Sequence, residues 1–180
     1  MNYAEIKDCD IANGDGVRVS LFVSGCPHHC KGCFNQVTWD FTYGQPFTND
    51  TIDHILNLLS RDYIDGLTIL GGEPLDEHNI SDVLTLVKQV RKYMPDKTIW
   101  CYTGSIITMD DFALHRGISP ADNYHNKKAD LLILCDIVVD GPFIEELKNI
   151  SLKFRGSSNQ RVIDVAETLL QQRITLKEGT

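Results

Sequence analysis

The stretch Leu67-Thr-Ile-Leu-Gly-Gly72 is the most informative about the fold. It is a short apolar run that ends in a pair of glycines. A run of this length predicts a buried strand that stops at a tight turn. Apolar residues recur at helical spacing on both sides of it, within 52–59 and within 80–90. A strand between two helices is typical of an α/β protein with a mostly parallel sheet.

Three further segments extend this pattern toward both ends of the chain. Residues 17–23 and 98–102 are rich in β-branched and aromatic residues and predict strands, and 131–139 predicts a helix end followed by a strand. About four strands are therefore visible, which is too few for a complete eight-stranded barrel. We expect a partial, open (β/α) barrel, with a mostly parallel sheet and outer helices.

The remaining segments have weaker patterns. Residues 24–50 predict a long loop, which contains a cysteine cluster and needs a function or a ligand to order it. We expect a short helix within 106–116 and an exposed polar loop over 117–128. The C-terminal tail, about 156–180, predicts one weak helix near 162–170.

The composition is ordinary for a globular chain, with 42% hydrophobic and 23% charged residues among 180. This length predicts a single domain, residues 1–180. No apolar run is long enough for a membrane span, and the N-terminus has no secretory pattern, so we expect a cytoplasmic protein without a membrane partner. The formal net charge of −8 argues against non-specific binding of nucleic acid, whose phosphates attract basic surfaces.

Three of the six cysteines form the run Cys26-x3-Cys30-x2-Cys33. Thiols stay reduced in the cytoplasm, so this run predicts metal ligands rather than disulfides. Iron–sulfur clusters take thiolate ligands, and a four-iron cluster normally takes four. A local set of three leaves one iron open to a substrate, by the logic that separates catalytic from structural metal sites.

Two other interpretations of the cysteine run remain open. A Cys3His zinc site would use His28 or His29, although no second ligand pair follows downstream, and these histidines more simply predict exposed loop residues. An electron-transfer cluster would need a fourth thiolate from one of the other cysteines, which otherwise predict buried or free thiols. Those other cysteines are Cys9, Cys101 and Cys135.

The cysteine spacing followed by Phe34 resembles the signature of the radical S-adenosylmethionine superfamily. Within it, the chain is similar to the activating proteins of anaerobic ribonucleoside-triphosphate reductase, which are activases of a glycyl-radical enzyme. The similarity extends from the N-terminus to residue 160 and is carried by Asp15-Gly16, Arg18, 21–25, 33–36, Thr38-Trp39, 44–48, Gly71–Leu75, 99–100, 102–104, 139–141 and Arg155–Gln160.

The resemblance implies two cofactors, a [4Fe-4S] cluster and S-adenosyl-L-methionine. Reductive cleavage would give a 5′-deoxyadenosyl radical, which would take a hydrogen atom from a glycine of the reductase. Expected partners are the large subunit of anaerobic ribonucleoside-triphosphate reductase and a low-potential electron donor such as flavodoxin. The alternatives are an activase of another glycyl-radical enzyme of the formate-lyase type and a non-catalytic iron–sulfur electron carrier.

The resemblance assigns the turn Gly71-Gly72-Glu73 to the methionine amino group of the cofactor. Glycines permit a close backbone approach, and the Glu73 carboxylate can accept a charge-assisted hydrogen bond from an ammonium group. The competing interpretation is a simple tight turn before a helix. The position of this turn after a predicted strand, downstream of the cysteine run, favours the cofactor role.

Other cofactor contacts are implied by the same resemblance. Gly32, Cys33 and Phe34 are expected near the adenine, although Phe34 also fits a core aromatic residue. Thr103 closes a predicted strand and is expected near the methionine end of the cofactor. Asp140 either reaches the ribose or serves as a turn residue before Gly-Pro. Related activating enzymes carry Asp-Leu-Lys there, and this chain lacks that lysine.

Three polar features have a family resemblance without a visible mechanism. Asp15 and Arg18 predict either a partner contact or a brace for the cysteine loop. The stretch Arg155–Gln160 predicts either a solvated loop or a site for a carboxylate of the cofactor or partner, which Arg155 would pair.

Overall fold

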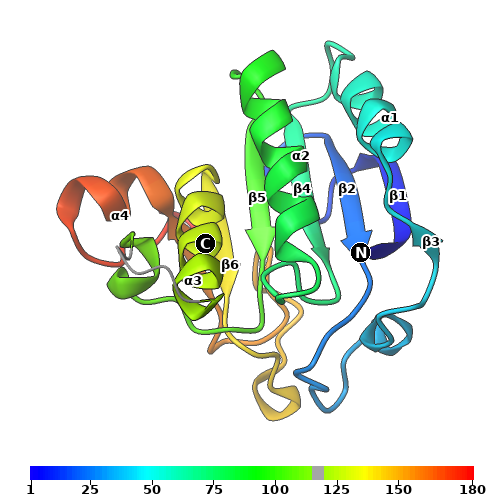
Figure 1. The fold of residues 1–180 in the computed structure, drawn as a ribbon. Coiled ribbons are helices and arrows are strands. Elements are labelled where there is room, and N and C mark those ends of the chain that lie inside the picture. The colour runs from blue at the N-terminus through cyan, green and yellow to red at the C-terminus, as the bar shows by residue number, and fades with distance from the viewer. Residues whose placement is uncertain (115–119) are drawn as a thin grey trace.

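Four parallel strands form the centre of the sheet. In a computed structural model, which describes residues 1–114 and 120–180, these strands are β2 (Arg18–Val23), β4 (Gly66–Gly71), β5 (Thr98–Tyr102) and β6 (Ile137–Asp140). Each strand pairs with the next, and Figure 1 shows β2, β4 and β5 pointing in the same direction. Their carboxyl ends therefore meet at one edge, where open α/β sheets bind ligands.

Antiparallel strands flank this centre on both sides. Strand β1 (Asn2–Asp10) pairs with β2, β3 (Gln45–Pro46) pairs with β1, and β7 (Arg161–Asp164) pairs with β6. The strand order is β3-β1-β2-β4-β5-β6-β7, so the sheet has two separate edges and is not a closed barrel. The predicted α/β class and the open, mostly parallel sheet are thereby confirmed.

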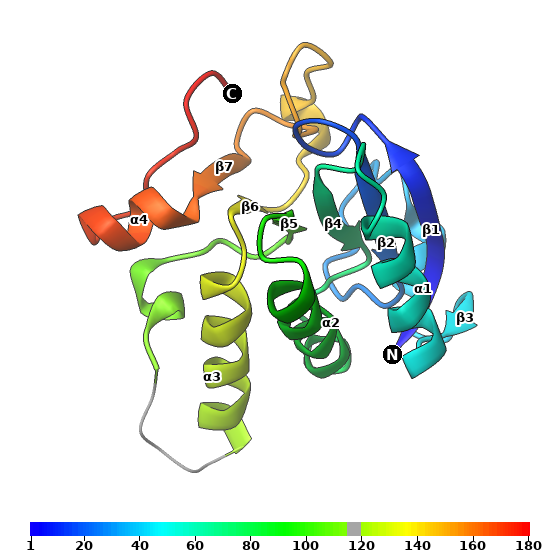
Figure 2. The same ribbon diagram turned by 90° about the horizontal axis from the view of Figure 1, so that it is seen from above.

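The helices follow the strands in sequence. They are α1 (Asn49–Leu59), α2 (Ile80–Tyr93), α3 (Pro120–Ile133) and α4 (Val165–Gln171). Figure 2 shows α1, α2 and α3 on one face of the sheet, whereas the loop around 142–160 lies on the opposite face. Within the ranges that the structure describes, no helix combines the length and apolar character needed to cross a membrane.

Alternate residues of each strand face the two sides of the sheet. Leu21, Ile69 and Ile99 face the helices and are fully buried in the larger apolar core. Burial of each such side chain contributes about 1.5–3 kcal/mol to stability. Trp100 and Val139 face the other side, where they belong to a smaller apolar cluster.

Arg18 closes the amino ends of the parallel strands. Its guanidinium is fully buried and donates to the hydroxyl oxygens of Thr68 and Thr98, at 2.6 and 2.9 Å. It also donates to the carbonyl oxygens of Asp15, Leu67 and Thr98. Burial lowers the pKa of Arg18 to about 10. Arg18 therefore braces the loop of Asp15 against the sheet, at the end opposite to the cysteine run.

Several weaker predictions need correction. Helix α3 begins at Pro120, so the predicted loop is wrong over 120–128, and 117–119 lie outside the described residues. The predicted helix within 106–116 is reduced to a 3-10 helix at Met109–Phe112, and 115–116 are not described. The tail contains strand β7 before helix α4, because pairing with β6 outweighs the helical spacing of residues 162–164. The three flanking strands were not predicted.

Candidate functional site

The cysteine run lies on a loop that leaves the carboxyl end of β2. We call residues 24–40 the cluster loop. The main chain closes this loop at its foot, where Gly25 N donates to Thr38 O at 2.7 Å and Cys26 N donates to Trp39 O at 3.2 Å. The polypeptide itself therefore defines the loop, which contains all three predicted ligands.

The three cysteines of the cluster loop are free thiols of intermediate exposure. Cys33 N donates to Cys30 O at 3.1 Å, and Asn35 N donates to Cys33 Sγ at 3.4 Å. Burial raises the pKa of the Cys26 thiol to about 11, although the backbone N–H groups of His28 and His29 bond its sulfur and act in the opposite direction. Such N–H donors stabilise a metal-bound thiolate and tune the potential of an iron–sulfur cluster.

The donor set of the cluster loop is three thiols on one short segment. Thiolates are the ligands that iron–sulfur clusters take, with one thiolate on each iron. The chemistry of the three cysteines therefore fits an iron–sulfur cluster.

The other cysteines lie away from the cluster loop. Cys101 on β5 and Cys135 after α3 are buried in the core between the sheet and the helices. Cys9 is exposed on β1, next to Asp10, which pairs with Arg18 at the amino end of β2. That none of the three supplies a fourth ligand stays a prediction.

The turn Gly71-Gly72-Glu73 is held against the cluster loop. Gly72 N donates to Val23 O and Glu73 N donates to Gly25 O, both at 2.7 Å. Gly71 has a φ of +108°, which favours glycine, and a Cβ on Gly72 would lie 2.4 Å from Gly25 O. Only glycines allow the turn to approach the loop this closely.

Glu73 is 3% exposed although it carries a carboxylate. Its Oε2 lies 2.7 Å from His28 Nε2 and accepts Gly104 N at 2.8 Å, and its Oε1 accepts Leu75 N at 3.0 Å. The bond to Glu73 raises the pKa of His28 above its usual value, against the effect of burial. The carboxylate has capacity for a further donor, because each oxygen carries two lone pairs.

A cavity of about 380 Å³ lies beside the smaller apolar cluster, on the face of the sheet opposite to helices α1–α3. Gly32, Cys33 and Phe34 line one side of it, and Leu70 and Tyr102 from β4 and β5 also line it. Phe34 is 87% exposed, so its interpretation as a core aromatic residue is wrong. The other lining residues are Ala12, Asn13, Phe143, 148–150, Leu152, 154–156 and Gln160.

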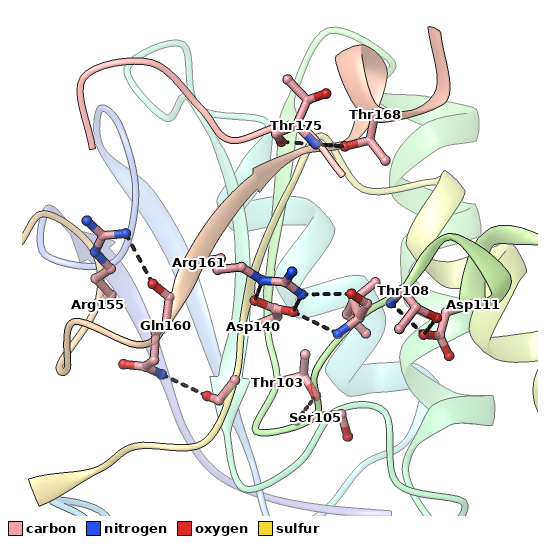
Figure 3. A network of polar contacts seen from close by, with 12 residues as sticks. Thr103, Ser105, Thr108, Asp111, Asp140, Arg155, Gln160, Arg161, Thr168 and Thr175 are labelled. Carbon is pink, nitrogen blue, oxygen red and sulfur yellow. Dashed lines mark hydrogen bonds and ion pairs between the residues drawn. The ribbon is translucent and has the colours of Figure 1, made fainter. Parts of the chain in front are cut away.

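Thr103 and Asp140 are buried and bonded within the protein. The Thr103 hydroxyl oxygen accepts Ser105 N at 3.0 Å. Asp140 Oδ1 accepts Arg161 Nε at 2.9 Å, and Oδ2 accepts Arg161 Nη2 and Ile107 N (Figure 3). This pair explains the burial of Asp140 without a ribose. The cofactor contacts of Thr103 and Asp140 stay predictions.

Comparison with known proteins agrees with this arrangement. The sequence matches the family described as "4Fe-4S single cluster domain" over residues 12–163. It is 40% identical over 164 residues to the anaerobic ribonucleoside-triphosphate reductase-activating protein of Escherichia coli K12, covering 90% of this chain and 97% of the relative. The chain belongs to this family of activating proteins. The family members of Enterobacteria phage T4 and Vibrio cholerae are 39% and 40% identical, over 90% and 89% of this chain and 93% and 96% of their own lengths.

In this member of the activating-protein family, the stretch Arg155–Gln160 shapes one wall of the cavity. Gln160 Oε1 accepts the N–H groups of Gly156 and Ser157 at 2.9 and 3.1 Å, and its Nε2 donates to Gly141 O. Arg155 donates to Gln160 O at 3.1 Å (Figure 3). We call residues 142–160 the wall loop. The stretch folds this loop and leaves Arg155 and Gln160 at the cavity.

Two parts of the site were not predicted. The apolar side chains of the wall loop, such as Phe143 and Phe154, follow no helical or strand spacing, so periodicity carries no signal for them. His28 was expected to be exposed, but its side chain is only 26% exposed because it contacts Glu73. His29 is exposed as expected. No sequence motif links His28 to Glu73, because the contact joins two separate segments of the chain.

Proposed function

We propose that the chain is a radical S-adenosylmethionine enzyme, with the partial barrel of that superfamily, which forms the glycyl radical on anaerobic ribonucleoside-triphosphate reductase. Similarity to the activating proteins over 90% of the chain supports this partner, and the 4Fe-4S family match supports the cluster. One observation carries the proposal. The three-cysteine loop and the Glu73 turn, about forty residues apart in sequence, are hydrogen-bonded to each other at the carboxyl edge of the sheet.

Different residues of the site would bind the two cofactors. Cys26, Cys30 and Cys33 would hold the cluster as thiolates, and the N–H groups that bond their sulfurs would tune its potential. Glu73 would accept the ammonium group of the methionine moiety. When bound, the cofactors supply reductive carbon–sulfur cleavage, which yields a 5′-deoxyadenosyl radical able to take a hydrogen atom from glycine.

The exposed cavity on the open face of the sheet is evidence that the substrate is a macromolecule. The cavity lies between the cluster loop and the wall loop, where Phe34 and Ile150 are 87% and 92% exposed. A glycine-bearing segment of the reductase would enter between them. We propose a low-potential donor such as flavodoxin as the electron source, and the cytoplasm as the reducing compartment in which six free thiols persist.

Anaerobic reconstitution tests the reaction directly. The protein is loaded with iron and sulfide, reduced and mixed with S-adenosylmethionine, and 5′-deoxyadenosine is measured. We expect this product from the loaded protein. Absence of product from a chain with a full cluster would overturn the enzyme proposal and favour an electron carrier.

A second measurement tests the partner. The loaded and reduced protein is incubated with S-adenosylmethionine and either the anaerobic reductase or a glycyl-radical enzyme of the formate-lyase type. Electron paramagnetic resonance then records the glycyl radical. We expect a radical on the reductase alone, and a radical on the other enzyme alone would refute the proposed substrate.

A further inference from the structure

His28 lies between the cluster loop and the ends of two strands. Its Nε2 is 2.7 Å from Glu73 Oε2, the same oxygen that accepts Gly104 N. The contact joins an imidazole nitrogen to a carboxylate oxygen, and such an oxygen can take part in two hydrogen bonds. The imidazole therefore joins the cluster loop to the turn after β4 and to the turn after β5.

The chain leaves room for this ring at Gly104. A Cβ at that position would lie 2.5 Å from His28 Cδ2, closer than real contacts allow. The backbone of Gly104 thus provides both a surface for the ring and an N–H group for the carboxylate that the ring contacts. Two independent features, a hydrogen bond and a steric fit, place His28 in one position.

His28 lies two positions after Cys26 in the cluster loop, so its main chain belongs to the segment that carries the predicted ligands. Its side chain contacts the carboxylate that we assign to the methionine moiety. The neighbouring His29 differs, since its ring packs against Trp39 in a tilted arrangement, with centroids 4.6 Å apart and an interplanar angle of 60°.

We propose that His28 is a positioning residue, which fixes the Glu73 carboxylate relative to the cluster loop. The carboxylate can then bind the ammonium group of the methionine moiety while the cofactor lies against the cluster. The inference rests on the proposed function, because it assumes that Glu73 receives the cofactor ammonium. It adds a residue that acts through Glu73 and that does not ligate iron.

Three variants of the 180-residue chain test this role. His28→Ala removes the bond to Glu73, and His28→Gln keeps a side-chain donor. His78→Gln is the matched control, because His78 Nδ1 lies 2.8 Å from Asp76 Oδ1 in a similar pair whose histidine is 75% exposed. Each variant is reconstituted, its iron and sulfide are counted, and S-adenosylmethionine is titrated against the electron paramagnetic resonance spectrum of the reduced cluster.

We expect His28→Ala to keep a full cluster and to bind S-adenosylmethionine about tenfold more weakly, as for loss of one charge-assisted hydrogen bond. His28→Gln should recover part of the affinity, and His78→Gln should match the parent protein. Wild-type affinity in His28→Ala would overturn the proposal. Selective loss of iron in His28→Ala would also overturn it, because His28 would then be a ligand.

Amide hydrogen exchange of the metal-free protein separates this inference from the proposed function. The N–H groups of Gly104 and Leu75 both bond Glu73. If His28 fixes the carboxylate, His28→Ala should speed exchange at these two amides and leave the helix α1 amides unchanged. Unchanged exchange would contradict the role of His28, whereas absence of 5′-deoxyadenosine from the parent protein would contradict only the proposed reaction.

Discussion

The two ends of the parallel strands hold buried charges in different ways. At the amino ends, Arg18 has five hydrogen bonds, all to hydroxyl and carbonyl oxygens of the surrounding strands and loop. At the carboxyl ends, Glu73 is bonded by two amides and by a histidine from the cluster loop. All five hydrogen bonds of Arg18 therefore stabilise the sheet and the loop before it, whereas Glu73 connects the sheet to the cluster loop, which carries three free thiols.

Asp140 is also buried at the carboxyl ends, but its hydrogen-bond partners differ from those of Glu73. Its two oxygens are matched by Arg161 and Ile107, much as the donors of Arg18 are matched by acceptors. The distinction between Glu73 and Asp140 therefore lies in their partners. The bonds of Asp140 join elements of the fold to one another, whereas those of Glu73 also connect the fold to the cluster loop.

The largest effect is expected from the cysteine run. Replacement of Cys26, Cys30 or Cys33 by Ala should abolish the cluster, because a three-thiolate site cannot lose one ligand and hold four irons. The Cys9→Ala and Cys101→Ala controls should retain it. Iron and sulfide analysis after anaerobic reconstitution measures both groups, and a full cluster in any of the first three variants would refute the ligand assignment.

Arg18→Met tests the amino ends of the strands. The change leaves several buried acceptors without donors, so the free energy of unfolding should fall by about 3 kcal/mol. Urea unfolding of the metal-free protein, followed by circular dichroism, measures the loss. Where the variant is folded, its affinity for S-adenosylmethionine should equal that of the parent, and a selective loss of affinity would give Arg18 a direct role in the site.

Asp140→Asn separates the structural role of this residue from the ribose contact. The variant weakens the pair with Arg161, and we expect the free energy of unfolding to fall by about 1–3 kcal/mol. Its affinity for S-adenosylmethionine, from the spectroscopic titration, should stay unchanged. If the affinity falls while stability is kept, the ribose contact is supported and the contrast with Glu73 fails.

Glu73→Gln tests the carboxylate that we assign to the cofactor. The amide keeps the shape but loses the charge, so S-adenosylmethionine should bind about tenfold more weakly, equivalent to about 1.4 kcal/mol. Glu77→Gln, an exposed residue four positions later, is the control. Equal affinities for the two variants would remove Glu73 from the cofactor site.

The smallest effect on the isolated protein is expected at Ile150. Ile150→Ser at the cavity mouth and Leu170→Ser on α4 both alter exposed side chains, so each should change the free energy of unfolding by less than about 0.5 kcal/mol. Only Ile150→Ser should weaken binding to the reductase, measured by sedimentation or interferometry. Equal binding by both variants would place the docking surface elsewhere.

Regular spacing made the centre of the fold predictable. The strands at 17–23, 67–70 and 98–102 and the helices over 52–59 and 80–90 follow apolar patterns that survive in the structure. Strand β1 contains four charged residues among nine, and most of its side chains are exposed or half-buried, so its sequence lacks an apolar signal. The first half of α3 is polar and was missed for the same reason, since burial begins at Ala129 among the α3 residues whose side chains are described.

The site was predictable as far as local motifs reached. The spacing of Cys26, Cys30 and Cys33 and the Gly71-Gly72-Glu73 turn are both readable in sequence, and the structure brings them together. The contact of His28 with Glu73 and the pair of Asp140 with Arg161 join residues 45 and 21 positions apart. Such contacts depend on how several helices, strands and loops pack together, so the sequence pattern of any one segment does not predict them.

The main-chain hydrogen bonds at the foot of the cluster loop have a consequence for damage and repair. These bonds join Gly25 to Thr38 and Cys26 to Trp39 without using any thiol. We therefore expect the loop to keep its path after air destroys the cluster. Iron and sulfide could then be reinserted without unfolding the chain, so that a cell returning to anaerobic conditions recovers the protein by reloading it and not by synthesising it again.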